Sequence, residues 1–221
     1  MIKVRAVIFD CDGVVVDSEG LSFDLLAQEL AQYGHPMGHD QMRALFLGGT
    51  MRSFWAEARA LGVPLPDEWV DAQYARMFAA LAEHTPLIPG IVEVLDALDA
   101  AGVPYAMGSN GPPRKMQITL GQHAGLIERF GRRIYSAQTL GAPKPAPDVY
   151  LHAAAVLAVA PADCVVVEDS VSGAKAARAA GMRCMGFAQH GQGDDLAAVG
   201  AVVFHHMPDL PSLLGLQTPL T

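Results

Sequence analysis

Short apolar runs and amphipathic segments follow one another along the chain. The run at 4–9 has the length and composition of a buried strand. From 18 to 84, apolar residues recur instead at helical spacing, in segments that mostly end at glycines. We therefore expect an all-helical block with helices at 22–34, 40–49, 51–62 and 66–84.

The pattern changes at "HTPLIPG" (84–90), a turn-rich segment. Beyond it, strand-like runs alternate with helical segments, which predicts a doubly wound, mainly parallel α/β sheet. The predicted strands are 103–109, 133–136, 164–169, 182–187 and 201–204. The predicted helices are 91–101, 113–121, 147–158 and 171–180. Because the strand at 4–9 joins this sheet, we expect an α/β core of 1–17 and 88–221 with a helical domain inserted at 18–87.

Composition narrows the classes of partner. With 15 Lys and Arg against 23 Asp and Glu, the net charge of −8 argues against nucleic acid or an anionic membrane as the main partner. No apolar run approaches the length of a transmembrane helix, so we expect a cytoplasmic protein. The three cysteines, Cys11, Cys164 and Cys184, are widely spaced and are expected to be buried and reduced. The sequence indicates no oligomeric state.

Candidate chemistry lies at the predicted strand ends, where open α/β sheets bind their ligands. The first strand ends in two aspartates, Asp10 and Asp12, and the next strands end in further polar residues. Carboxylates that converge on one site need a counter-charge, which Mg²⁺ with oxygen ligands supplies. We expect Mg²⁺ to bind Asp10 and Asp169, with Glu168 either as a further ligand or as a residue that orients its neighbours. The strand-end residues are Asp10, Asp12, Ser109, Asn110, Glu168 and Asp169, with Lys144 on a loop nearby.

Two aspartates with this spacing can flank a phosphorus atom, since their side chains would lie roughly 6–7 Å apart if the strand persists. Asp10 would attack phosphorus and form an aspartyl-phosphate. Asp12 would protonate the leaving oxygen and then deprotonate a water. Ser109 and Lys144 would orient the phosphoryl oxygens. Taken singly, each of these motifs could also be a turn or a solvated loop.

The motifs together resemble a known family. In order, "DCDGVVVDS", "GSN", "GAPKPAPDVY" and "VVVEDSVSGAKAARAAGM" resemble the four signature motifs of the haloacid-dehalogenase-like (HAD) hydrolases with a helical cap. The resemblance covers essentially the whole chain. It implies Asp10 as nucleophile, Asp12 as acid/base with its backbone carbonyl on the metal, Asp169 as metal ligand, and Ser109 and Lys144 as phosphate ligands. It also implies a phosphatase, because true dehalogenases lack the aspartate at position 12.

The cap is expected to select the substrate by closing over the crevice. Its loop at 45–53 is the segment expected to reach down, and it includes Gly49. Arg52 in this loop could clamp a substrate carboxylate or a second phosphate, or could simply begin an exposed helix. Asn110 and Lys115, near the second motif, are further candidate substrate-binding residues.

These observations predict a Mg²⁺-dependent phosphomonoester hydrolase acting on a small metabolite, either a sugar phosphate or a sugar-acid phosphate. One alternative is a phosphosugar mutase, since the chain also resembles β-phosphoglucomutases. Ser22 and Gly48 stand where those mutases carry a cap histidine and a lysine, although Arg52 matches a mutase arginine. A second alternative is a non-catalytic binding protein on the same scaffold.

Overall fold

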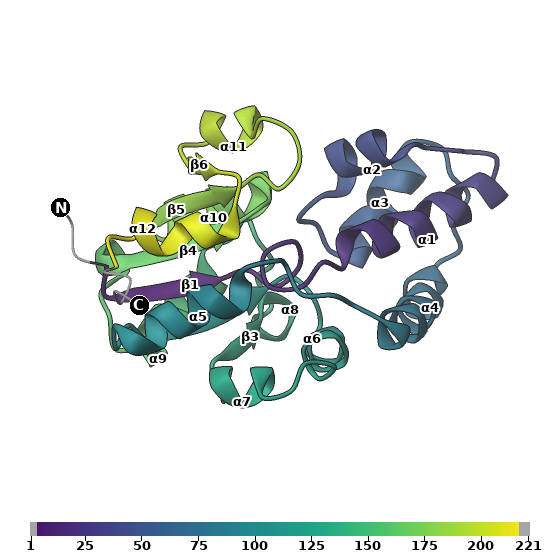
Figure 1. The fold of residues 1–221 in the computed structure, drawn as a ribbon. Helices are drawn as coiled ribbons and strands as arrows, with labels where there is room; N and C mark the ends of the chain where they lie inside the picture. The colour runs from purple at the N-terminus through teal and green to yellow at the C-terminus, as the bar shows by residue number, and fades with distance from the viewer. Residues whose placement is uncertain (1–3, 217–221) are drawn as a thin grey trace.

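The core is a parallel sheet between two helical layers. The computed structural model describes residues 4–216, apart from the side chains at 39 and 44–46. In this range six strands form one parallel sheet in the order β3-β2-β1-β4-β5-β6 (Figure 1). This confirms the predicted doubly wound fold. The strands are β1 (Ala6–Phe9), β2 (Tyr105–Ser109), β3 (Ile134–Ser136), β4 (Cys164–Glu168), β5 (Arg183–Phe187) and β6 (Val202–Phe204).

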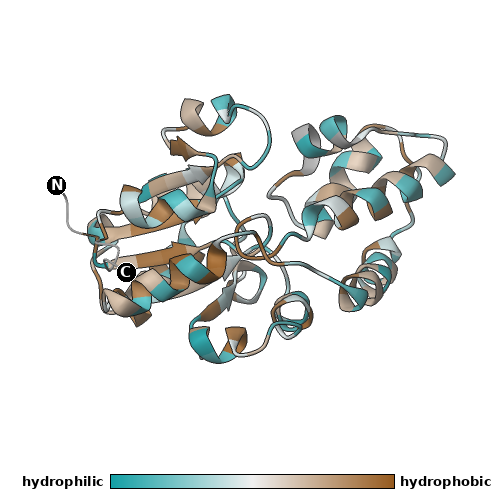
Figure 2. Ribbon diagram, viewed as in Figure 1, coloured by the Kyte–Doolittle hydropathy of each residue, from teal (hydrophilic) through white to brown (hydrophobic). Residues whose placement is uncertain are grey.

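Strand β1 is central and is buried on both faces. Val7 and Phe9 pack into the core on one side, and Ala6 and Ile8 into the core on the other. Such a strand reads as a continuous apolar run, which is why 4–9 was recognisable (Figure 2). The first face is covered by α5 (Ile91–Ala100), α6 (Pro113–Leu120), α7 (Leu126–Phe130) and α12 (Leu210–Leu213). The second is covered by α8 (Ala137–Leu140), α9 (Asp148–Val156), α10 (Val171–Ala179) and α11 (Asp194–Ala198).

The cap lies to one side of this core and has its own hydrophobic centre (Figure 1). Within it, the rings of Phe54 and Trp69 stack with centroids 5.5 Å apart. The indole nitrogen of Trp69 donates a 3.0 Å hydrogen bond to buried Glu29. The cap helices are α1 (Glu19–Gln32), α2 (His39–Phe46), α3 (Met51–Ala60) and α4 (Trp69–Glu83). All four fall inside the segment 18–87 expected for the insertion.

The two chain crossings between cap and core run side by side. Val16 forms an antiparallel bridge with Leu87, and the Asp17 amide donates a 2.8 Å hydrogen bond to the Pro86 carbonyl. Because the two connecting segments are bonded to each other, they hold the cap close to the end of β1. The cap therefore lies over the edge of the sheet where the candidate residues gather.

Short helices account for most differences from the sequence prediction. Helices α7, α8, α11 and α12 have only four or five residues, too few for a helical period to be recognised. The three cysteines are buried and unpaired, as predicted. Among the described residues, no helix combines the length and apolar character that a membrane span requires.

Candidate active site

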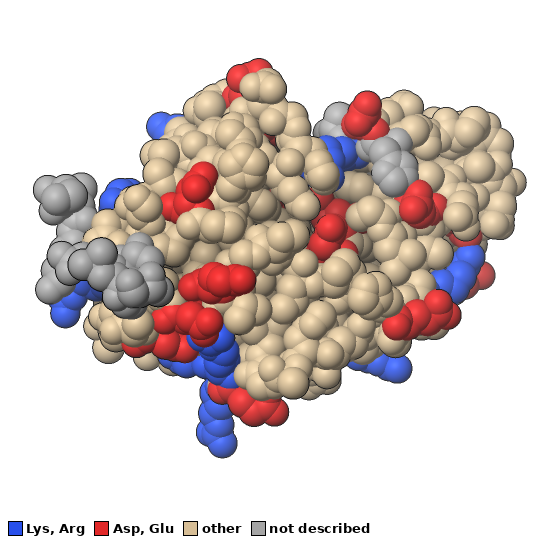
Figure 3. All heavy atoms as spheres, in the orientation of Figure 1, with Lys and Arg blue, Asp and Glu red and all other residues tan. Residues whose placement is uncertain are grey.

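A cavity of about 130 Å³ lies between the carboxyl edge of the sheet and the cap. Figure 3 shows acidic side chains and a basic one at the hollow between the two parts. All but one of the predicted site residues line this cavity, and the exception is Arg52. The predicted residues that line it are Asp10, Asp12, Gly49, Ser109, Asn110, Lys115, Lys144, Glu168 and Asp169.

A tight turn after β1 places the two leading aspartates. The Cys11 carbonyl accepts hydrogen bonds from the amides of Val15 and Val16, at 2.9 and 3.0 Å. Gly13 has a φ of +75°, and a Cβ atom on it would overlap the carboxylate of Asp169. Only glycine allows this turn to approach the end of β4 so closely. The turn thus brings the first and fourth motifs together.

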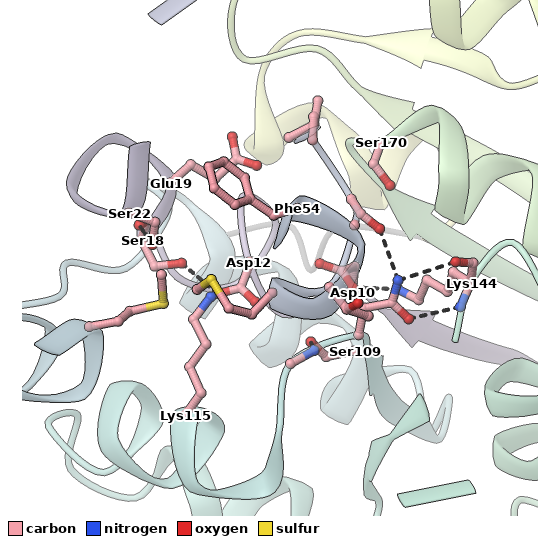
Figure 4. A pocket seen from close by; sticks show the side chains of 18 of the residues that line it. Asp10, Asp12, Ser18, Glu19, Ser22, Phe54, Ser109, Lys115, Lys144 and Ser170 are labelled. Atoms are coloured by element: carbon pink, nitrogen blue, oxygen red, sulfur yellow. Dashed lines mark hydrogen bonds and ion pairs between the residues drawn. The ribbon is translucent and has the colours of Figure 1, made fainter. Parts of the chain in front are cut away.

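Lys144 is held between two carboxylates at the floor of the cavity (Figure 4). Its ammonium forms an ion pair with Asp10 and a 2.6 Å contact with Glu168 Oε1. Its side chain is only 2% exposed. Burial by itself would lower the pKa of Lys144, but Asp10 and Glu168 raise it above its ordinary value. Lys144 is therefore a fixed positive charge beside the predicted nucleophile.

Both oxygens of Glu168 are used by protein donors. Oε1 accepts from Lys144 and from the Tyr150 hydroxyl at 2.7 Å. Oε2 accepts from the amides of Asp169 and Ser170, at 3.1 and 3.0 Å, and from the Ser170 hydroxyl at 2.8 Å. Although burial opposes it, these contacts, led by Lys144, lower the pKa of Glu168. Of the two roles predicted for Glu168, this geometry favours orientation of its neighbours over direct metal ligation.

Asp12 contacts a lysine and a serine through one oxygen. Its Oδ1 accepts from Ser18 Oγ at 2.5 Å and lies 2.7 Å from Lys115 Nζ (Figure 4). Burial would raise the pKa of Asp12, but Lys115 and Ser18 lower it below its ordinary value. Lys115, predicted as a substrate ligand, is thus also the partner of Asp12. The sequence prediction did not include Ser18, although it ends the first motif.

A second carboxylate pair lies beside the first. Asp169 and Glu19 both line the cavity, and Arg43 lies 3.1 Å from Glu19. Burial and mutual repulsion raise the pKa of Asp169 well above its ordinary value, and burial also raises that of Glu19. Glu19 was not predicted. Its position one residue after the first motif, at the start of α1, is the signal that could have found it.

The charge distribution fits a bound divalent cation. Burial raises the pKa of Asp10 to about 8, with Glu168 and Asp12 adding to the effect and Lys144 opposing it. Three buried carboxyl groups, Asp10, Asp169 and Glu19, thus have raised pKa values, which a bound cation would lower. Within residues 4–216, no three His, Cys, Asp or Glu side chains cluster as a complete metal cage. Mg²⁺ needs no such cage, since it commonly binds one or two carboxylates together with waters and a substrate phosphate.

Asn110 joins the core to the cap loop. Its Nδ2 donates to the Gly48 carbonyl at 2.9 Å, and its Oδ1 accepts from the Lys144 amide at 2.8 Å. The Asn110 carbonyl accepts a 2.7 Å hydrogen bond from Gln138, whose amide nitrogen also lies 3.0 Å from the Tyr74 hydroxyl. Asn110 was predicted to bind substrate, and here its side-chain amide also binds two loops of the protein.

The cap loop rests directly on the core at Gly48. This residue has a φ of +73°, and a Cβ atom on it would lie 2.5 Å from Ser170 Cβ and Oγ. Residues 47–51 line the cavity, as expected for the loop at 45–53. Arg52 does not: its side chain is exposed, while the neighbouring Met51 is buried and lines the cavity. The cap loop therefore contributes to the cavity as predicted, but Arg52 does not.

Comparison with known proteins shows which family the chain belongs to. The sequence model described as a haloacid dehalogenase-like hydrolase matches residues 4–181. The chain belongs to that family. Its relatives include a 6-phosphogluconate phosphatase of Escherichia coli, 29% identical over 96% of each chain. Hexitol phosphatase B of Escherichia coli is 32% identical over 82% of each chain. These relatives confirm the predicted class of enzyme, a HAD-type phosphatase.

Three further relatives follow: one is a longer protein, and the other two have solved structures. A bifunctional riboflavin kinase/FMN phosphatase of Arabidopsis thaliana is 31% identical over 80% of this chain, which spans 46% of that protein. A haloacid dehalogenase-like protein of Agrobacterium tumefaciens has a TM-score of 0.83 and 34% identity, covering 96% of this chain and 97% of that one. A HAD family hydrolase of Deinococcus radiodurans, with bound phosphate and sodium, has a TM-score of 0.79 and 35% identity over the whole of both chains.

Proposed function

We propose that the protein is a Mg²⁺-dependent phosphatase that hydrolyses the monoester of a small phosphorylated metabolite. The observation that carries this proposal is the placement of Asp10, Asp12 and Lys144 around one cavity, with Asp169 beside them. Each of these four residues lies at a strand end or on an adjoining loop. Ion pairs hold Lys144 beside Asp10 and Lys115 beside Asp12. The phosphatase relatives support the same reaction class.

The reaction proceeds in two displacements. An Asp10 carboxylate oxygen attacks phosphorus, and the bond from phosphorus to the ester oxygen breaks. Asp12 must carry a proton at this step, and it gives that proton to the departing oxygen, so that an alcohol leaves. Asp12 then takes a proton from water, whose oxygen attacks the phosphoryl group and releases Asp10 and inorganic phosphate. Lys144 and Ser109 hold the phosphoryl oxygens throughout.

The metal site in this proposal is formed by Asp10, Asp169 and the backbone carbonyl of Asp12. Bound there, Mg²⁺ would offset the charge of the phosphoryl group and of the two carboxylates. Glu168 supports the site through Lys144 and the chain at 169–170. The raised pKa values of Asp10 and Asp169 are consistent with a missing positive charge.

Phosphate release is the direct test. The full chain is incubated with sugar phosphates, sugar-acid phosphates and p-nitrophenyl phosphate, with and without Mg²⁺. We expect release that requires Mg²⁺ and falls by roughly 10⁴-fold or more in Asp10→Asn, whose circular dichroism should match the wild type. An active Asp10→Asn protein would refute Asp10 as the nucleophile. Conversion of a sugar 1-phosphate to its 6-phosphate without free phosphate would instead identify a mutase.

A further inference from the structure

The cap side of the cavity is lined mainly by apolar side chains, with Glu19 and four hydroxyl side chains among them. Helix α1 contributes Phe23 and Leu26, helix α3 contributes Met51 and Phe54, and helix α4 contributes Met77. All five are at most 7% exposed. The sheet edge holds the phosphoryl group, so the leaving group must face this wall.

No arginine of the cap lines the cavity, although Arg43 pairs with Glu19, which does. The segment 18–87 contains no lysine, and three of its arginines pair with carboxylates. Arg52 is exposed and does not line the cavity. This holds with the cap loop already seated on the core, because Asn110 bonds Gly48. The pairs are Arg43–Glu19 at 3.1 Å, Arg59–Asp67 at 2.5 Å and Arg76–Glu29 at 2.5 Å.

The lysines on the core side of the cavity are also paired with carboxylates. Lys144 lies between Asp10 and Glu168, and Lys115 lies 2.7 Å from Asp12. Among the described side chains that line the cavity, these are the two lysines or arginines. A second anionic group on the substrate would have to draw Lys115 away from Asp12. Otherwise it would be buried without a partner, which is costly.

Hydroxyl groups on the cap wall already have protein partners. Ser22 donates to the Ser18 carbonyl at 2.7 Å, Thr50 accepts from the Ser53 amide at 3.1 Å, and Tyr74 accepts from Gln138 at 3.0 Å. A leaving group rich in hydroxyls would have to share these hydroxyls with their present protein partners. Carbon surface on the leaving group would be matched by carbon and sulfur on the wall.

We infer that the preferred substrate is the phosphate monoester of an uncharged alcohol that presents carbon surface to the cap. This inference rests on the proposed phosphatase function and narrows it. It favours an uncharged ester over a sugar-acid phosphate or a bisphosphate. Selection occurs by exclusion, because each lysine among the described side chains that line the cavity is already paired with a carboxylate.

Matched esters test the inference directly. Propyl phosphate, glycerol 3-phosphate and 3-phosphoglycerate share a three-carbon skeleton and differ in hydroxyls and charge. 4-Carboxybenzyl phosphate differs from benzyl phosphate by one carboxylate. We expect kcat/KM to fall by about 100-fold from glycerol 3-phosphate to 3-phosphoglycerate and from benzyl phosphate to 4-carboxybenzyl phosphate, and to be higher for propyl phosphate than for glycerol 3-phosphate. Equal or faster turnover of the charged esters would overturn the inference.

Variants of the cap test whether its apolar wall selects uncharged substrates. Met51→Lys puts an ammonium beside the leaving group and should raise the ratio of charged to uncharged kcat/KM by about tenfold. Met51→Leu keeps the wall apolar and should leave that ratio within about threefold. Arg52→Ala should also leave it unchanged, and a selective loss of charged-ester turnover in Arg52→Ala would contradict the inference. If Met51→Lys proves unfolded by circular dichroism, the wild-type pairs and Arg52→Ala still decide.

Failure of the proposed function has a different signature. If no ester, p-nitrophenyl phosphate included, releases phosphate with Mg²⁺ present, the phosphatase proposal falls and the inference falls with it. If phosphate is released with a preference for charged esters, the phosphatase proposal stands and only the inference is wrong.

Discussion

On the core side of the cavity, Lys144 and Lys115 each contact a carboxylate, whereas on the cap side Phe54 and Met77 present apolar side chains. The charged groups come from strand ends, from the loops beside them and from helix α6, and each contacts a group of opposite charge. The apolar groups come from the cap helices and belong to the hydrophobic centre of the cap. We interpret the core wall as the part that performs the chemistry and the cap wall as the part that selects the alcohol.

Substitutions on the core wall and on the cap wall should have different effects. A change on the core wall removes a specific hydrogen bond or charge and leaves its partner buried without one, so its effect is large. A change on the cap wall alters shape or contact, so its effect is smaller and differs between substrates. The variants below run from the most deeply bonded core residue to the contact between the two parts.

Glu168→Gln should have the largest effect of the four. It removes the charge that faces Lys144 and places an amide nitrogen among groups that are all donors. We expect kcat to fall by roughly 100-fold and the free energy of unfolding to fall by about 3 kcal/mol. Steady-state kinetics and urea unfolding measure the two. The exposed Glu83→Gln on α4, which changes the net charge equally, should shift stability by less than about 0.5 kcal/mol.

The affinity for Mg²⁺ separates the two roles considered for Glu168. If Glu168 only orients Lys144 and the 169–170 backbone, Glu168→Gln should retain Mg²⁺ affinity within a few-fold in calorimetry. A large loss of affinity with unchanged stability would make Glu168 a direct ligand and contradict the positioning role.

Lys115→Met should have the next largest effect, because Lys115 favours the ionised form of Asp12, which takes the proton from water in the second displacement. Without the ammonium, the pKa of Asp12 rises from its lowered value. Any limb of the pH–rate profile that reports ionisation of Asp12 should therefore move to higher pH. We expect kcat to fall by roughly 30-fold at neutral pH. Lys115→Arg should restore part of the rate, and the exposed Lys175→Met should not alter the profile. An unshifted limb in Lys115→Met would show that this ion pair does not control Asp12.

The sequence predicted the core wall much better than the cap wall. Asp10, Ser109 and Asp169 could be placed because the carboxyl ends of parallel strands meet at one edge, whatever the packing between them. The central strand β1 was recognisable for the same reason, since a strand buried on both faces is apolar throughout. Topology alone was sufficient for these positions.

Positions on the cap depended on the rotation of single helices. Arg52 and Met51 are adjacent, yet only Met51 faces the cavity, because α3 turns about 100° per residue. The buried residues of α3, Met51, Phe54 and Ala58, follow helical spacing, so the apolar period excluded Arg52 from the inner face. The hydrogen-bond partners of the Glu168 oxygens could not be predicted, since they depend on contacts between distant segments.

Gly48→Ala tests the contact between the two walls. The new Cβ would meet Ser170 at about 2.5 Å, in a backbone conformation that favours glycine. The cap loop could then not seat on the core, and we expect kcat/KM to fall by roughly tenfold for all esters. Gly34→Ala is a matched control: Gly34 has a φ of +79°, and a Cβ atom there meets nothing within 4 Å. It should lower stability by about 1 kcal/mol without changing kcat/KM. Equal kinetic effects in both variants would remove the special role of Gly48.

Tyr74→Phe should have the smallest effect and is the most specific probe of cap docking. It removes the hydroxyl that accepts from Gln138 at 3.0 Å but keeps the ring that stacks on Phe78 with centroids 5.5 Å apart. The loss of one neutral hydrogen bond between cap and core should lower kcat/KM by about threefold. Because Gln138 also donates to the Asn110 carbonyl, Gln138→Ala should cost more. If the Tyr74–Gln138 contact transmits docking of the cap to Asn110, the double variant should lose less than the two single losses combined. Independent losses that multiply in the double variant would mean that Tyr74 acts only on the substrate, and the cap wall would then contribute a polar contact of its own.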